Sequence, residues 1–148
     1  MNLTYRCRHE KLDGNIRVKR PIIPAFLLGK DNKRIQITAI LDSGSDFILI
    51  PREIADLLEL EYDYKKTNNA DSFDGTKLTT TQSNVRIIIE KDRDLRQFEC
   101  KCAVLLNKDF DHDELIFGSS FFENFKISFD YPKNKFSIKD SQVNVNLC

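Results

Sequence analysis

The chain has 148 residues, and its 23 lysines and arginines balance 23 aspartates and glutamates, so the formal net charge at pH 7 is zero. This length predicts a single domain that can bury a hydrophobic core. The balanced, interspersed charges give no electrostatic case for nucleic acid or an anionic membrane as a partner. Because no apolar run approaches the roughly 18 residues of a membrane span and residues 1–15 lack a signal-peptide core, we expect a cytoplasmic protein.

The first predicted element is a β-hairpin. Residues 21–28 are apolar, residues 29–32 have turn chemistry, and apolar side chains then alternate from Ile35 to Leu41. Such alternation is typical of a strand with one buried face. We therefore expect Asp42 to lie at the end of the second strand of this hairpin.

Asp42 lies in the stretch A-I-L-D-S-G-S-D-F-I-L-I-P, residues 39–51, between two aliphatic runs. Carboxylates are almost never fully buried unless something pairs with them, so one flanked in this way needs a partner or a chemical task. The simpler alternative is a turn residue whose side chain bonds to its own backbone.

A short amphipathic helix is predicted directly after this stretch. Pro51 suits the first turn of a helix. Ile54, Leu57 and Leu58 recur at i, i+3 and i+4, which is the spacing of an apolar helix face.

A polar hairpin is predicted within residues 68–84, which are rich in threonine. The dipeptide Asp74-Gly75 in its middle favours a tight turn. Such a hairpin has little apolar surface to bury, so we expect it to be mobile. Phe73, its only aromatic residue, either contacts a ligand or packs locally.

The second half of the chain repeats the alternation. Two strand faces are predicted on either side of a turn at residues 91–94, and a later apolar strand ends in Ile116-Phe117-Gly118. A serine cap at residues 119–120 starts a short helix, and a closing hairpin spans residues 127–138. The apolar side chains of the two faces are Val85, Ile87 and Ile89, then Phe98, Cys100, Cys102, Val104 and Leu106.

The cysteines and the acidic loop give no cofactor site. No C-x-x-C motif and no Cys/His ligand spacing occurs, so we expect reduced, structural thiols at Cys7, Cys100, Cys102 and Cys148. An acidic loop lacks the rest of a ligand set for a divalent ion, and we favour a solvated loop. Its residues are Asp111, His112, Asp113 and Glu114. We therefore predict no metal and no cofactor.

The order of these elements resembles that of retropepsin-type aspartic proteases. Residues 40–45 (I-L-D-S-G-S), the Asp74-Gly75 hairpin and residues 116–118 (I-F-G) match the family's strand with its catalytic triplet, its flap, and its second hydrophobic-glycine motif. The resemblance covers residues 21–138. It implies an all-β, acid-protease-like closed barrel of one lobe, with a flap hairpin and one or two short helices.

By the same resemblance, the protein is an endopeptidase with Asp42 as its catalytic residue. Hydrolysis of an amide without a metal or a covalent nucleophile needs one carboxylate to deprotonate water and a second, protonated one to polarise the carbonyl. The resemblance implies that Ser43 bonds to its symmetry mate, that Gly44 lets amides approach Asp42, and that Ser45 bonds its outer oxygen. The flap and second-motif residues implied in this way are Phe73, Asp74, Gly75, Thr76, Ile116, Phe117 and Gly118.

The chain holds one Asp-Ser-Gly triplet, whereas the reaction needs two carboxylates. The resemblance therefore implies a C2 homodimer in which Asp42 meets its own copy, acting on a peptide or protein substrate. The alternating Val143, Val145 and Leu147 either add a strand to the dimer interface or form a frayed tail.

The residues before the barrel carry a basic cluster at Arg17, Lys19 and Arg20. They form an extra strand, a self-cleaved segment or a solvated arm. The predicted segments are a leader (1–20), a retropepsin-like domain (21–140) and a tail (141–148).

Two serines follow Gly118 where many retropepsins have Arg, Asn or Asp, which tie the dimer together. The ion pair that often supports such a dimer is therefore not expected here. The alternative function is a peptide-binding or dimerisation module of the same fold, in which cleavage is weak or lost.

Overall fold

The computed structural model of the protein describes residues 2–71, 75, 77–107 and 114–141. In this part of the chain the secondary structure is mainly β-strand, with two short α-helices. The elements, in chain order, are β1 (Asn2–Arg6), β2 (Arg8–Lys11), β3 (Arg17–Arg20), β4 (Ile22–Leu28), β5 (Arg34–Leu41), β6 (Ile48–Pro51), α1 (Arg52–Leu57), β7 (Asn68–Asp71), β8 (Lys77–Lys91), β9 (Asp94–Leu105), β10 (Leu115–Phe117), α2 (Ser119–Phe122), β11 (Phe125–Asp130) and β12 (Lys135–Asp140).

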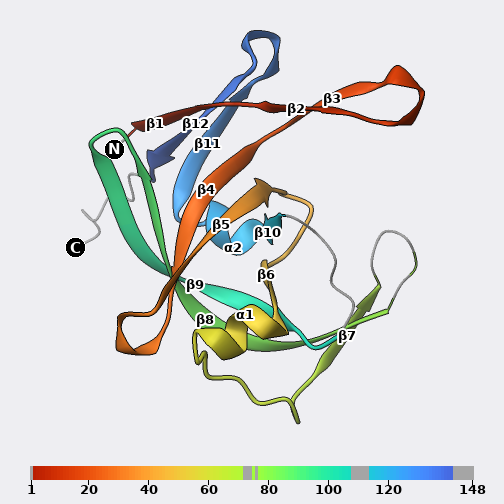
Figure 1. Ribbon diagram of the computed structural model, residues 1–148, viewed down its shortest axis with the longest axis vertical. Coiled ribbons are helices and arrows are strands. Elements are labelled where there is room, and N and C mark those ends of the chain that lie inside the picture. The colour runs from red at the N-terminus through yellow and green to blue at the C-terminus, as the bar shows by residue number, and fades with distance from the viewer. Residues whose placement is uncertain (1, 72–74, 76, 108–113, 142–148) are drawn as a thin grey trace, which may run out of the picture.

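The large sheet closes on itself (Figure 1). Its described strands run in the order β4-β5-β10-β6-β9-β8-β7, and β8 also pairs with β4. This extra pairing completes a ring, so that of these strands only β7 stands outside it. Two pairs of neighbouring strands are parallel, β5 with β10 and β6 with β9. The predicted all-β closed barrel with short helices is confirmed.

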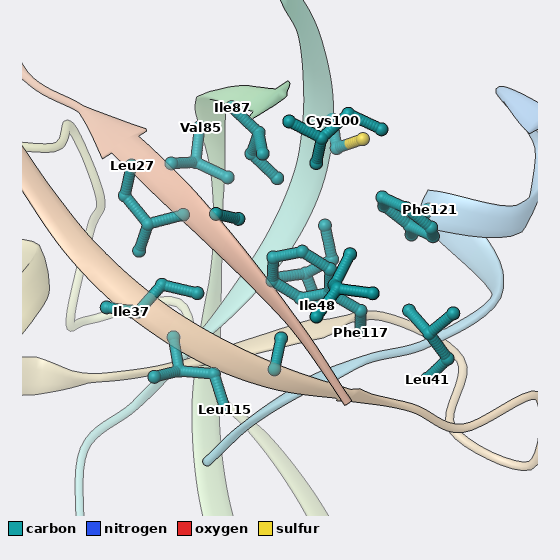
Figure 2. Close-up of a cluster of buried hydrophobic side chains, with 14 of the residues drawn as sticks. Leu27, Ile37, Leu41, Ile48, Val85, Ile87, Cys100, Leu115, Phe117 and Phe121 are labelled. Atoms are coloured by element: carbon teal, nitrogen blue, oxygen red, sulfur yellow. The ribbon is translucent and has the colours of Figure 1, made fainter. Parts of the chain in front are cut away.

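The core lies inside this barrel (Figure 2). Successive side chains of a strand point to opposite faces, so a strand with one face in the core buries every second residue. On β8 and β9 the positions that alternation predicts to be buried include Val85, Ile87, Ile89, Cys100, Cys102 and Val104, and all six are buried. At the end of β9 the alternation breaks down, because Ala103 and Leu105 are buried as well. The side chain of Phe121 on α2 packs on the same core, with its ring centroid 5.1 Å from that of Phe117.

The predicted short helix is α1, which starts at Arg52 with Pro51 as its N-cap rather than in its first turn, and its buried stripe also differs from the prediction. Ala55 and Leu58 are fully buried and Ile54 is partly buried, whereas Leu57 is 63% exposed. The assignment of Leu57 to the apolar face is therefore wrong. At 3.6 residues per turn, Leu57 lies about 100° around the helix from the centre of the stripe that the other three form. Neither described helix is long and apolar enough to cross a membrane.

A separate three-stranded sheet joins the two ends of the described chain, in the order β1-β12-β11. The predicted closing hairpin is β11–β12, with Phe129 opposite Phe136. In β1, which pairs with β12, Leu3 and Tyr5 are buried in the core. The following residues form the two-stranded hairpin β2–β3, which extends away from the barrel (Figure 1). The leader thus contributes strands, one of them packed on the core.

Candidate active site

Asp42 directly follows β5 and is exposed. Strand β10 runs parallel beside β5 with Phe117 opposite Leu41, and the N–H of Asp42 donates to the carbonyl oxygen of Phe117 at 3.0 Å. On the other side of β5, the N–H of Leu41 donates to the carbonyl oxygen of Pro21 at 2.9 Å. Strands on both sides therefore fix the backbone at this position, while Asp42 itself stays at the surface.

Asp42 opens a tight turn. The N–H of Ser45 donates to the carbonyl oxygen of Asp42 at 3.2 Å, and the N–H of Gly44 donates to the Oδ1 of Asp42 at 2.9 Å. The second bond is the one that a turn aspartate makes with its own backbone, and here it orients the carboxylate. A Cβ on residue 44 would lie 3.2 Å from that Oδ1. Glycine therefore lets the amide come close without crowding the carboxylate.

Gly118 packs against the backbone of this turn. A Cβ at residue 118 would lie 2.3 Å from the carbonyl oxygen of Ser45 and 2.5 Å from that of Phe47. Any side chain would collide with main-chain atoms, so this contact requires glycine. The N–H of Ser119 then donates to the carbonyl oxygen of Ser45 at 2.7 Å. The hydrophobic-glycine motif and the Asp42 turn are thus in direct contact.

Ser120 joins α2 to the start of β6. Its Oγ accepts a hydrogen bond from the N–H of Ile48 at 3.1 Å, and its N–H donates to the carbonyl oxygen of Asp46 at 3.3 Å. The prediction of a serine cap is wrong, because the N-cap of α2 is Gly118 and no side chain caps that helix. Both serines lie within the helix, and the buried hydroxyl of Ser120 bonds to the first residue of β6 instead of capping α2. No local sequence pattern predicts this contact between residues 72 positions apart.

The two serines of the triplet bond differently from the pattern that the resemblance implies. The Oγ of Ser45 donates to the carbonyl oxygen of Phe47 at 3.1 Å rather than to the carboxylate of Asp42, and Ser43 is exposed. Among the described residues, the N–H of Gly44 is the one donor to the Asp42 carboxylate. An exposed carboxylate held in this way can take a proton from water or share one with a second carboxyl group.

The polar hairpin is formed by β7 and the first part of β8, where Asp71 pairs with Lys77. Between them Gly75 has a φ of 83°, in the left-handed region that glycine adopts without strain. The other flap residues of the prediction, Phe73, Asp74 and Thr76, lie outside the described residues.

Asn107 bonds to the β8 strand of this hairpin, a role that no local sequence pattern predicts. Its Oδ1 accepts a hydrogen bond from the N–H of Thr79 at 2.7 Å, and its Nδ2 donates to the carbonyl oxygen of Lys77 at 3.1 Å. The side-chain amide thus bonds to β8 as a neighbouring strand would. A lone asparagine in a polar segment gives no periodic signal of such a role.

The described residues contain no group of three or more His, Cys, Asp or Glu side chains that could hold a metal ion. Of the acidic loop only Glu114 is described, and it pairs with Arg8 at 2.7 Å. The residues outside the described part are Asp111, His112 and Asp113 of this loop and Val143, Val145 and Leu147 of the tail.

Cys7, Cys100 and Cys102 are free and buried. Burial raises the pKa of the Cys100 and Cys102 thiols to about 12. Thiols that stay protonated at neutral pH are poor nucleophiles and poor metal ligands. These cysteines therefore act as core side chains.

Comparison with known proteins supports the architecture. No family model matches the sequence, and no curated protein matches it. Among solved structures, the crystal structure of a retropepsin-like aspartic protease from Rickettsia conorii is similar, with a TM-score of 0.56 and 20% sequence identity. The alignment covers 93% of this chain and 89% of that chain. The likeness shows that this chain has the acid-protease-like fold along nearly its whole length.

Proposed function

We propose that this protein is an aspartic endopeptidase in which Asp42 from each of two subunits forms the catalytic pair. The observation that carries the proposal is the placement of Asp42, an exposed carboxylate on a turn that backbone bonds fix from both sides, in a barrel of acid-protease-like fold. The sequence has one Asp-Ser-Gly triplet, and the reaction needs two carboxylates. A two-fold axis supplies the second.

The chemistry follows from the proximity of the two carboxyl groups. Two carboxylates about 3 Å apart cannot both ionise cheaply, so the pair holds one proton at its working pH. The ionised Asp42 takes a proton from water, and the protonated one donates a hydrogen bond to the scissile carbonyl. The substrate is an extended peptide, which pairs with the edge of the flap hairpin as an added strand.

Such a pair has a characteristic pH profile. Activity should follow a bell on the acidic side of neutrality, because one carboxyl must be ionised while the other is protonated. Chelators and thiol reagents should leave the activity unchanged, since neither a metal nor a thiol takes part. Loss of activity with a chelator would instead implicate the loop from Asp111 to Glu114.

Subunit mixing tests the shared site. Wild-type protein is mixed with increasing amounts of Asp42→Asn protein, and mass spectrometry confirms that subunits have exchanged. Each heterodimer would carry one usable carboxylate, so activity per wild-type chain should fall as mutant is added, beyond any effect of substrate competition. Constant activity per wild-type chain after confirmed exchange would show that a single subunit is the active unit.

A protein that binds unfolded peptide but cleaves none across acidic to neutral pH would instead be the peptide-binding module. The assay therefore includes a transition-state-mimicking inhibitor of aspartic proteases, which should abolish any cleavage that depends on the Asp42 pair.

A further inference from the structure

The β2–β3 hairpin has one face made entirely of basic side chains. His9 lies opposite Lys19 and Lys11 lies opposite Arg17, and residues directly opposite one another point to the same face. We call these four residues the basic face. Lys11 and Arg17 carry like charges directly opposite each other, an arrangement that destabilises a hairpin.

The other face of the same hairpin shows how the chain neutralises such a pair. Arg8 lies opposite Arg20, which is again a pair of like charges. Here Glu114 pairs with Arg8 at 2.7 Å, and Glu10 pairs with Arg20 at 3.2 Å. Each arginine of this face therefore has a carboxylate of its own.

On the basic face, the described part of the chain supplies no such carboxylate. The Nζ of Lys19 donates to the carbonyl oxygen of Tyr131 at 2.7 Å, which fixes the hairpin to the β11–β12 turn. Lys11 and Arg17 are exposed, and the described residues place no ion-pair partner beside them. The fold thus leaves cationic groups facing solvent on a hairpin anchored at its base.

The base of this hairpin lies beside the Asp42 turn. In the β4–β5 pair Ile22 lies opposite Ile40, and the N–H of Leu41 donates to the carbonyl oxygen of Pro21. The end of β3 is therefore at the same end of this strand pair as Asp42. From there the hairpin extends outward (Figure 1). At about 3.3 Å per strand residue, Arg17 lies about 10 Å along β3 from its last residue.

We propose that the basic face is an exosite that binds an acidic segment of the polypeptide substrate. This inference rests on the proposed function, because it names the class of substrate that the Asp42 site receives. An extended peptide advances about 3.3–3.6 Å per residue. The separation of Arg17 from the end of β3 thus corresponds to about three residues of an extended peptide. We therefore place the acidic segment three or more residues from the scissile bond, where its carboxylates would complement the charge of Lys11 and Arg17.

Peptide binding tests the exosite without requiring cleavage. Two fluorescein-labelled unfolded peptides share one central sequence, and one carries a flanking run of glutamates that the other replaces with glutamines. Binding of each is measured by fluorescence anisotropy with the Asp42→Asn protein, which leaves the peptide intact. We expect tighter binding of the acidic peptide, and the preference should be lost in about 0.5 M NaCl because salt screens exposed charges.

The double variant Lys11→Gln/Arg17→Gln should weaken binding of the acidic peptide about three- to tenfold, as expected for the loss of two exposed charge contacts. Lys11→Glu/Arg17→Glu should reverse the preference toward the glutamine peptide. The matched control is Lys126→Gln/Lys139→Gln, which removes an exposed pair of lysines that lie opposite each other on β11 and β12. The Lys126→Gln/Lys139→Gln variant should still bind the acidic peptide more tightly than the glutamine peptide.

Three outcomes would overturn the exosite. The first is equal binding of the two peptides, and the second is a preference that the control variant removes and the hairpin variant keeps. The third is hairpin-dependent binding of a single-stranded oligonucleotide or a phosphatidylserine vesicle that is tighter than binding of the acidic peptide. A wild-type protein that binds the acidic peptide through the hairpin but cleaves nothing would refute the protease and leave the exosite standing.

Discussion

Asp42 and Gly118 occupy corresponding positions after two parallel strands, yet one is exposed and carries a carboxylate while the other is buried and has no side chain. Each follows a pair of hydrophobic residues, and the preceding residues Leu41 and Phe117 lie side by side. Asp42 carries a carboxylate at the surface. Gly118 is buried and carries no side chain, and a Cβ there would meet main-chain oxygens at 2.3 and 2.5 Å. One strand end presents the carboxylate that we propose as reactive, and the other makes room for the turn that holds it.

The two residues should therefore respond differently to substitution, Asp42 through activity and Gly118 through stability. A change at Asp42 should remove activity and leave the fold, because the side chain contributes one hydrogen bond at the surface. A change at Gly118 should disturb the fold itself, because its contacts are with buried backbone. The predictions below test this division, beginning with the largest effect.

Asp42→Asn should lower the rate of peptide hydrolysis at least about a thousandfold, because asparagine keeps the shape but cannot hold the shared proton. The urea midpoint of unfolding should stay within error of the wild type. Both are measured on the same preparation. Full activity in this variant would end the assignment of Asp42.

Gly118→Ala should lower the free energy of unfolding by about 3 kcal/mol, because main-chain atoms of Ser45 and Phe47 cannot move aside as a side chain can. Gly44→Ala is the matched control. Its Cβ would meet the Oδ1 of Asp42 at 3.2 Å, and that exposed side chain can rotate, so its cost should stay below about 1 kcal/mol. Equal urea midpoints for the two variants would contradict the close packing at Gly118.

Ser120→Ala should lower the free energy of unfolding by about 1–2 kcal/mol, because it leaves the buried N–H of Ile48 without its acceptor. Ser119→Ala is the control, since no hydrogen bond of its hydroxyl is found among the described residues, and it should be nearly neutral. Urea denaturation of both variants measures the difference. An effect confined to Ser119→Ala would show that the helix has the cap that the sequence suggested.

The smallest expected effect is on stability and concerns the ion pair between Asp140 and Arg96. A hydrogen bond from Arg96 lowers the pKa of Asp140, and the Nε of Arg96 lies 2.8 Å from its Oδ1. A lowered folded-state pKa adds stability above the unfolded pKa, which is lost as pH falls through the folded one. Arg96→Gln should therefore cost a few tenths of a kcal/mol at neutral pH, since the pair is partly exposed.

That cost should disappear in strong acid, where Asp140 is protonated in both folded and unfolded chains. Urea denaturation at neutral pH and in strong acid, well below the usual pKa of an aspartate, measures the difference. A cost that is the same at both pH values would show that Arg96 acts through packing rather than through this carboxylate.

Periodicity was enough to predict the barrel strands. The alternation around Val85 and around Cys100 identified β8 and β9, because a strand with one face in the core must bury every second side chain. It did less well for α1, where a helix of six residues has too few turns to define a stripe. Leu57 therefore fitted the helical spacing and is nevertheless exposed.

The side-chain supports of the Asp42 turn and of the polar hairpin could not be predicted from local sequence. Ser120 bonds to Ile48 and Asn107 bonds to Thr79, and each pair joins distant parts of the chain. Single polar side chains carry no period, so their partners become known only when the strands are placed. The resemblance found Gly118, but the reason for a glycine there is the backbone of residues 45–47 beside it.

The separation of these partners along the chain also sets an order of events during synthesis. Ile48 and Ser120 are 72 residues apart, and at 5–20 residues per second the ribosome adds the second roughly 4–14 s after the first. Until then β5 has no β10 beside it, and the turn after Asp42 has neither Gly118 nor Ser120 to rest on. A nascent chain therefore carries Asp42 for several seconds before β10 and α2 can hold its turn in place, and the proposed active site can form only after these elements have been synthesised.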